Sequence, residues 1–311
     1  LVRHEHAAAS MAAGYAQLTG KPGVCLVTAG PGATNLVTAV AEAYVGALPV
    51  VILAARASTV NAHRGAAQEV STEKIFAPIT KFAIRADRSD HLVDLVRQAF
   101  AIARSGKPGP VFLDIPRDLL DGEVEFGHYE PSAERARVPG PSDVVARVGR
   151  ELLGARRPLL VAGGGTVASG AFAELRELAE LLRAPVLTSM SGRGSLPDDH
   201  PLAAGGLGAH RNDLSKRLLV EADVLLGLGT RFEEMETNWR PGYVPADGSR
   251  YLQVDLDPAE LGRSIPAHIG VVGDVRTVLR QLLDLVRPAR AGEATPFADD
   301  PRVREVVEAV A

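Results

Sequence analysis

Short runs of apolar residues alternate with helix-forming segments along most of the chain, and this alternation limits the folds that are open to it. Nearly continuous apolar strands joined through helices are typical of parallel sheets that are covered by helices on both faces. We therefore expect an α/β fold with a doubly wound parallel sheet in the first half. The runs lie at residues 23–28, 49–53 and 110–115, with helical patterns at 6–19, 33–46 and 90–105.

The second half repeats the pattern, which predicts a second parallel-sheet domain of Rossmann-like type. Its strands are expected at residues 159–162, 185–188, 224–228, 251–254 and 269–272, and its helices at 171–183, 213–221 and 275–286. A polar stretch with prolines at 117–142 is the best candidate for the domain boundary. We expect domains at 1–127 and 141–288, followed by a linker rich in Pro, Ala and Asp at 289–311.

Composition and charge exclude several classes of partner. Apolar residues make up 46% of the chain and charged residues 23%, values that are ordinary for a globular protein. The formal net charge of −4 gives no reason to expect nucleic acid or an anionic membrane as a partner. No apolar run approaches the roughly 20 residues of a membrane span. Cys25 is the only cysteine and lies in an apolar run, so we expect a buried core residue in a cytoplasmic protein.

Two features near the start of the chain are weak when each is read alone. The turn Gly30-Pro31-Gly32, with Asn35 just beyond it, joins a predicted strand to a helix and could present backbone N–H groups to a ligand. It matches neither a dinucleotide-binding fingerprint nor a P-loop, so by itself it indicates only a tight turn. Glu5 opens an Ala-rich helix, where a carboxylate is ordinarily explained by the helix dipole.

Three strand ends in the second half carry glycines or polar residues. Ligands of open α/β sheets bind at the carboxyl ends of the strands, so these residues suggest a nucleotide-type crevice. Ordinary turn glycines and aspartate caps would produce the same pattern, and both interpretations stay open. No histidines, cysteines or carboxylates have metal-ligand spacing, so no metal site is predicted in this chain. The residues concerned are Gly163, Gly164, Gly165, Thr230, Arg231, Asp255 and Asp257.

In their order along the chain, these and other motifs closely resemble the acetolactate synthase-like family of thiamine diphosphate-dependent enzymes. The pyrimidine-binding domain of that family resembles residues 2–8, 14–16, 28–35, 68–69 and 114–118, and its central domain resembles residues 163–165, 205–208, 229–232, 255–258 and 273–275. The resemblance covers nearly the whole chain and implies a truncated pyrimidine-binding domain followed by a central domain.

The resemblance implies roles for particular residues. Glu5 matches the glutamate that hydrogen-bonds the aminopyrimidine ring of thiamine diphosphate, and a water-poor pocket would raise its pKa so that it holds a proton. Gly30, Pro31, Gly32 and Asn35 would lie beside the cofactor. Gln68 and Lys81 match positions that line the substrate side. The implied reaction decarboxylates a 2-oxo acid and adds the product to a second carbonyl, for example two pyruvates to 2-acetolactate and CO2 in branched-chain amino acid biosynthesis.

The resemblance also implies parts that this sequence lacks. The family holds diphosphate and Mg²⁺ on a C-terminal domain, and the first strand of the pyrimidine-binding domain would precede Leu1, so this chain alone is expected to be inactive. A homodimer or homotetramer with a shared active site is implied as well.

Two departures leave the subclass open. Ala67 replaces an aromatic residue, which leaves the acceptor substrate open, and residues 208–211 replace the family's Gly-Met-His-Gly, which leaves FAD open as a second cofactor. A 2-oxo acid decarboxylase, glyoxylate carboligase, sulfoacetaldehyde acetyltransferase or non-catalytic nucleotide-binding module remains an alternative. An NAD-dependent dehydrogenase is disfavoured, because no G-x-G-x-x-G turn opens either half.

Overall fold

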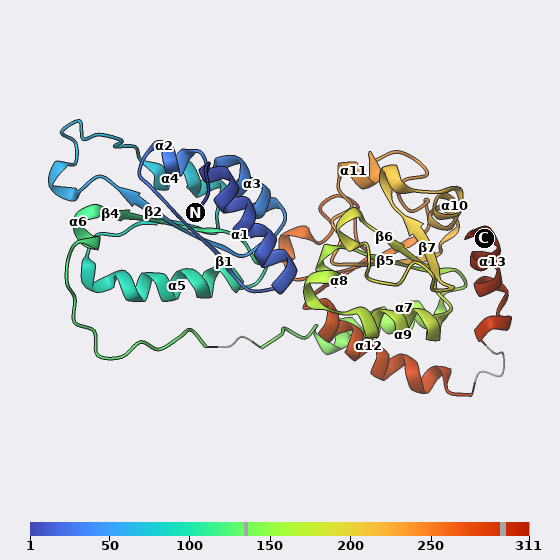
Figure 1. Cartoon of the computed structure of the whole chain (residues 1–311). Helices are drawn as coiled ribbons and strands as arrows, with labels where there is room; N and C mark the ends of the chain where they lie inside the picture. The colour runs from blue at the N-terminus through green and yellow to red at the C-terminus, as the bar shows by residue number, and fades with distance from the viewer. Residues whose placement is uncertain (134–135, 293–296, 311) are drawn as a thin grey trace. The chain divides into compact units, whose positions relative to one another are not determined.

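The chain folds into two units, each built on one parallel sheet (Figure 1). The computed structural model describes residues 1–133, 136–292 and 297–310. The division between the units falls after residue 135, inside the polar stretch that was predicted as the boundary. The predicted α/β class with two parallel-sheet domains is therefore confirmed.

The N-terminal unit has a sheet of order β1-β2-β4-β3 in which all neighbouring strands are parallel. Its strands are β1 (Gly23–Val27), β2 (Val50–Arg56), β3 (Phe82–Arg85) and β4 (Val111–Pro116). Its helices are α1 (Glu5–Thr19), α2 (Pro31–Thr34), α3 (Val37–Val45), α4 (Thr72–Phe76), α5 (Leu92–Arg104) and α6 (Arg117–Leu120), with 3-10 turns η1 (Thr59–Asn61), η2 (Ala77–Ile79) and η3 (Ser89–His91).

Helices cover the two faces of this sheet differently. The apolar side chains of α1 and α3 pack on one face, and those of α5 pack on the other. Phe76 and Phe112 stack with ring centroids 4.1 Å apart in the first of these cores. Cys25 is buried there as predicted, and burial raises the pKa of its thiol to about 12. Every residue of β4 is buried, including Asp114, and the other five residues of the strand are apolar.

The central unit has a sheet of order β10-β9-β8-β5-β6-β7, again with parallel neighbours throughout. Its strands are β5 (Pro158–Ala162), β6 (Val186–Thr188), β7 (Ala203–Gly206), β8 (Val224–Leu228), β9 (Arg250–Asp255) and β10 (Ile269–Val272). Its helices are α7 (Ser142–Gly154), α8 (Gly164–Ser169), α9 (Phe172–Leu182), α10 (Asp213–Glu221), α11 (Glu234–Thr237), α12 (Val275–Arg290) and α13 (Pro301–Val310), with 3-10 turns η4 (Met190–Gly192), η5 (Gly208–His210), η6 (Pro258–Glu260) and η7 (Phe297–Asp299).

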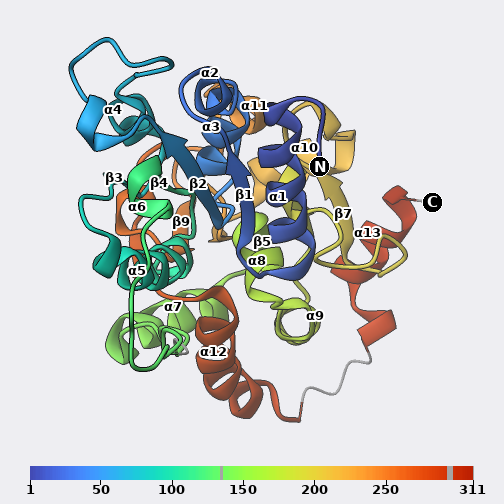
Figure 2. The same cartoon turned by 60° about the vertical axis from the view of Figure 1, so that its left-hand side comes forward.

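Helices also cover both faces of the central sheet. Figures 1 and 2 show α7, α9 and α12 grouped on one face, where their apolar side chains form the larger core. On the other face α10 packs together with α13, whose Val306 is fully buried. The expected linker at 289–311 is therefore wrong for its last helix, because α13 buries apolar side chains in the central unit. Residues 293–296 and 311 of that expected linker lie outside the described residues.

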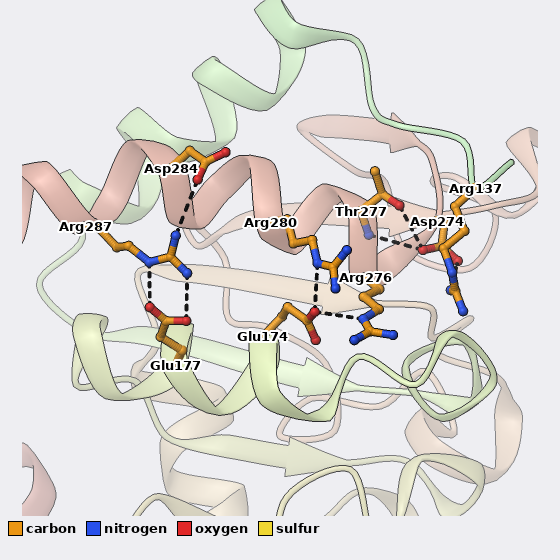
Figure 3. A network of polar contacts seen from close by, with 9 residues as sticks. All are labelled: Arg137, Glu174, Glu177, Asp274, Arg276, Thr277, Arg280, Asp284 and Arg287. Carbon is orange, nitrogen blue, oxygen red and sulfur yellow. Dashed lines mark hydrogen bonds and ion pairs between the residues drawn. The ribbon is translucent and has the colours of Figure 1, made fainter.

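A network of carboxylates and arginines joins α9 to α12 (Figure 3). Glu174, only 7% exposed, accepts hydrogen bonds at Oε1 from Arg276 Nε at 2.8 Å and Arg280 Nε at 2.9 Å. One turn further along α9, the more exposed Glu177 accepts two hydrogen bonds from Arg287, at 2.6 and 2.9 Å. Both glutamates therefore accept two hydrogen bonds from arginines of α12, but Glu174 is buried and Glu177 is exposed.

The polypeptide just before α7 is fastened to the start of α12. Arg137 Nη1 forms an ion pair with Asp274 Oδ2 at 2.9 Å, and the Asp274 backbone N–H donates to the Val138 carbonyl at 2.8 Å. Gly140 and the Gln281 side-chain amide exchange two hydrogen bonds, at 2.9 and 3.0 Å. The central unit thus begins before the predicted residue 141.

Candidate active site

Glu5 is the first residue of α1, and the glycine turn that follows β1 lies beside its carboxylate. Asn35, which ends α2, donates a hydrogen bond from Nδ2 to Glu5 Oε2 at 2.9 Å. A Cβ atom on Gly32 would lie 3.4 Å from Glu5 Oε1 and only 2.5 Å from Thr28 Cγ2. The structure therefore brings Glu5, Gly32 and Asn35 together, as the sequence predicted. Pro31, which lies between Gly30 and Gly32, is the first residue of the short helix α2.

Gln68 reaches the same turn from a distant part of the chain. Gly30 has a φ of +54° and Gln68 a φ of +61°. A Cβ atom on Gly30 would lie 2.6 Å from the Gln68 carbonyl oxygen, so only glycine allows this approach. Beside Gln68, the Glu69 carboxylate accepts a hydrogen bond from the His63 backbone N–H at 2.9 Å. Gln68 is thus held against the turn that contacts Glu5.

The electrostatics of Glu5 reflect its partial exposure in this chain. A water-poor pocket was expected to raise the pKa of Glu5, but the hydrogen bond from Asn35 lowers it, and a backbone hydrogen bond at Glu5 lowers it further. Desolvation acts in the opposite direction and is outweighed, because the carboxylate is only partly covered. The contact with Asn35 therefore favours the ionised form of Glu5 in this arrangement.

Lys81 is not brought to the other predicted site residues. It immediately precedes β3, at the amino end of a parallel sheet, whereas Gly30 and Gly32 follow the carboxyl end of β1. Its Nζ donates to the Ile102 carbonyl at 2.7 Å and also contacts Ser105 at the end of α5. Lysine ammonium groups stabilise the free carbonyls at a helix C-terminus. In this chain Lys81 is engaged at the end of α5, and its place on the substrate side stays a prediction.

In the central unit, the Gly163–Gly165 turn packs against the end of β8. The Gly165 backbone N–H donates to the Gly229 carbonyl at 3.0 Å. A Cβ atom on Gly163 would lie 2.2 Å from the Gly229 oxygen, and one on Gly165 would lie 2.7 Å from Gly229 Cα. Gly164 faces Ser191 instead. Because Gly163 and Gly165 have no side chains, the backbone after β5 can contact the backbone after β8 at Gly229. These are the two neighbouring strands at which the strand order of the sheet reverses.

A buried carboxylate lies at this same reversal point, and sequence reasoning missed it. Glu236 in α11 is 8% exposed, and Thr230 Oγ1 lies 3.3 Å from its Oε2. Burial raises the pKa of Glu236 and the nearby Glu233 carboxylate raises it further, while hydrogen bonds from Thr230 and Ser189 act in the opposite direction. Arg231 forms an ion pair with Glu233 at 3.0 Å. Glu236 belongs to a polar run, which gave no sequence signal of burial.

Asp255 and Asp257 shape the turn after β9. Asp255 Oδ1 accepts from the Asp257 backbone N–H at 2.9 Å, and Asp257 Oδ1 accepts from the Ala259 N–H at 3.0 Å. The second contact caps η6. These hydrogen bonds are those of ordinary aspartate turns.

A cleft of about 350 Å³ lies at the carboxyl end of β6, beside the edge strand β7. Thr188, Ser189, Leu207 and Asn212 are among its lining residues. The sequence gave no sign of it, because β7 is a short Ala/Gly segment that was not predicted as a strand. In the described parts of both units, no three His, Cys, Asp or Glu side chains are grouped so that they could hold a metal ion. Among the same residues, none of the helices combines the length and apolar composition needed to cross a bilayer.

Two family models match the two units. Residues 1–75 match the N-terminal TPP binding domain of thiamine pyrophosphate enzymes, and residues 145–282 match their central domain. The chain is 39% identical over 91% of its length to a Methanocaldococcus jannaschii protein named "Probable acetolactate synthase large subunit". It is 35% identical over 92% of its length to the acetolactate synthase isozyme 3 large subunit of Escherichia coli.

The chain spans 49% and 50% of these two relatives, about half of their length. A solved structure from Mycobacterium smegmatis, described as "a putative thiamin diphosphate-dependent enzyme", is 28% identical with a TM-score of 0.81. That match covers 91% of this chain and 54% of the other. The chain therefore belongs to the thiamine pyrophosphate enzymes, of which it carries the N-terminal and central domains.

Proposed function

We propose that the full-length protein uses thiamine diphosphate to decarboxylate a 2-oxo acid and to join the remaining carbon unit to a second carbonyl compound. Two pyruvates giving 2-acetolactate and CO2 is the leading reaction, which would place the protein in branched-chain amino acid biosynthesis. The observation that carries this proposal is the Glu5 carboxylate beside the Gly30–Gly32 turn, with Asn35 and Gln68 in contact with the same turn.

The Glu5 carboxylate fits the hydrogen-bonding edge of an aminopyrimidine ring. Asn35 anchors Oε2, while Oε1 faces Gly32, where there is no side chain to cover it. A carboxyl group anchored in this way can still donate or accept at its second oxygen. When bound, thiamine diphosphate supplies an acidic carbon and an electron sink for decarboxylation. Glu5 would hold the proton that the ring exchanges, and Gln68 would orient the 2-oxo acid.

The proposed role of Glu5 requires that its carboxyl group be shielded from water more completely than it is in this chain. The function requires a carboxyl group that holds a proton near neutral pH, but the pKa of Glu5 is lowered here. Excluding water from Glu5 would raise its pKa. We therefore place the cofactor and a second subunit over Glu5, in a homodimer or homotetramer with a shared site. Mg²⁺ and the diphosphate would be held by ligands outside the residues described here.

We also propose that the central unit binds no FAD. Gly163 and Gly165 are in contact with backbone at Gly229, and the buried Glu236 carboxylate lies next to Thr230. An anionic pyrophosphate at this point would meet carboxylates in a region of low dielectric constant, which is unfavourable. The same observations disfavour a nucleotide-binding module. We expect the purified full-length protein to have no visible flavin absorbance band, and a band equivalent to one flavin per chain would contradict this.

The test of the proposed function is CO2 release by the full-length protein. The bound cofactor is removed by dialysis with a chelator, and pyruvate is supplied with or without thiamine diphosphate and Mg²⁺. We expect CO2 and acetolactate only when both are returned. CO2 with acetaldehyde instead would identify a decarboxylase. If neither pyruvate, glyoxylate nor sulfoacetaldehyde supports turnover that depends on thiamine diphosphate, the proposal fails.

A further inference from the structure

The connection between β2 and α4, residues 57–71, starts at a buried ion pair. Arg56 is the last residue of β2 and is only 8% exposed. Its Nη1 donates to Oδ2 of Asp114, a fully buried residue of the adjacent strand β4, at 2.7 Å. The polypeptide that leaves the sheet after Arg56 is therefore fixed at its first residue.

The same carboxylate holds the other end of the connection. Thr72, the first residue of α4, donates from Oγ1 to Asp114 Oδ2 at 2.8 Å. The next residue, Glu73, accepts from Arg56 Nη1 at 2.8 Å. Both ends of residues 57–71 are thus tied to one oxygen atom of Asp114, directly by Thr72 and through the guanidinium of Arg56.

Between these ends, the connection carries Gln68. Its first part is held by Asp118, whose Oδ1 accepts from the Thr59 backbone N–H at 2.9 Å. Its last part is closed by the hydrogen bond between Glu69 and the His63 N–H. Gln68 lies between these contacts, with its backbone against Gly30. A shift at either end of the connection would change the distance between Gln68 and the turn beside Glu5.

Burying the Asp114 carboxylate at this position costs free energy of solvation. Among the described residues, its Oδ1 atom is buried and has no hydrogen-bond partner. Burial raises the pKa of Asp114, while Arg56 and Thr72 act in the opposite direction. Buried ion pairs add little net stability compared with apolar residues of similar volume, and their best-attested use is to specify one arrangement. The structural result of this one is the fixed path of residues 57–71.

We propose that Asp114 is a positioning residue that sets where Gln68 lies against the glycine turn, by fastening both ends of residues 57–71. Arg56 and Thr72 transmit its effect to the two ends. The consequence for turnover rests on the proposed function, in which Gln68 faces the 2-oxo acid. The effect on the connection itself does not depend on that function.

Hydrogen exchange in the full-length protein tests the fastening. Asp114→Asn keeps the shape of the side chain and removes its charge, and Thr72→Val removes only the bond at the far end. Both are expected to speed exchange in peptides from residues 57–71 about tenfold, because local opening costs less. Asp90→Asn, which breaks an exposed ion pair with Arg88 in the same unit, is the matched control. Unchanged exchange in Thr72→Val, or equal effects in the control, would overturn the proposal.

Kinetics of the full-length enzyme test the positioning. Asp114→Asn is expected to raise KM for the 2-oxo acid about tenfold, equivalent to ~1.4 kcal/mol, and to change Kd for thiamine diphosphate by less than about twofold. Adding it to Gln68→Ala should change kcat/KM no further, because both act through one side chain. Multiplied effects would mean that Asp114 does not act through Gln68. If the parent enzyme lacks turnover that depends on thiamine diphosphate, the proposed function fails, and the exchange result still decides the role of Asp114.

Discussion

Glu5→Gln in the full-length enzyme is expected to lower kcat about a thousandfold while the fold stays intact. Glutamine can still accept the hydrogen bond from Asn35, which now ends on Glu5 Oε2. It cannot give or take a proton, and positioned proton transfer contributes about 10²–10⁴-fold to rates. Because Glu5 is partly exposed and opens α1, its replacement should cost little stability. Steady-state kinetics at saturating thiamine diphosphate, with circular dichroism as the check on folding, measure both effects.

Glu42→Gln provides the matched control for this prediction. Glu42 is an exposed glutamate on α3 of the same unit, and its replacement should leave kcat unchanged. Turnover in Glu5→Gln above about a tenth of the parent value would show that Glu5 does not handle the proton. An equal loss in both variants would point to a general effect of removing a negative charge.

Glu174→Gln is expected to lower the free energy of unfolding of the central unit by about 2 kcal/mol, since hydrogen bonds to charged groups contribute about 1.5–3 kcal/mol. Glu177→Gln, which breaks an exposed pair with Arg287, should cost less than about 1 kcal/mol. Glu174 is buried and binds Arg276 and Arg280 with a single oxygen (Figure 3). Urea unfolding can be followed through Trp239, the only tryptophan, which lies in this unit.

The Glu174 effect should also depend on pH. Burial raises the pKa of Glu174, but the hydrogen bonds from Arg276 and Arg280 outweigh burial and leave the pKa lowered in the folded state. A carboxyl group of this kind contributes stability above its unfolded pKa and loses it as pH falls through the folded value. The difference between parent and Glu174→Gln should therefore shrink on acidification. A difference that is constant with pH would mean that packing rather than charge determines it.

Much of the fold follows from local patterns in the sequence. The strand at 224–228 and the helix at 213–221 lie where the sequence predicted them. The strand is a continuous apolar run, and in the structure the side chain of Asn212 caps the helix. The strands β3 and β7 were missed, since both are short and β7 consists of alanine and glycine. The expected helix at 33–46 breaks into α2 and α3, with Asn35 and Leu36 between them.

The candidate site was predictable only in part. The motif order placed Glu5 with the glycine turn, and the structure brings them together. Lys81 could not be placed without knowing that β3 begins directly after it. The lowered pKa of Glu5 depends most on its contact with Asn35, which no spacing rule supplies. Glu236 is buried, and Thr230 and Ser189 reach it from the ends of other strands, which is a property of the folded sheet.

The fastening of residues 137–140 to α12 has a practical consequence for separating the two halves. A truncated polypeptide that begins at residue 141 would lose both hydrogen bonds to the Gln281 amide and the acceptor for the Asp274 N–H. It would also uncover Val271 and Val278, against which Gly140 packs. A polypeptide that begins at residue 136 keeps residues 137–140, so that the separated central unit retains the contacts that cover the start of α12.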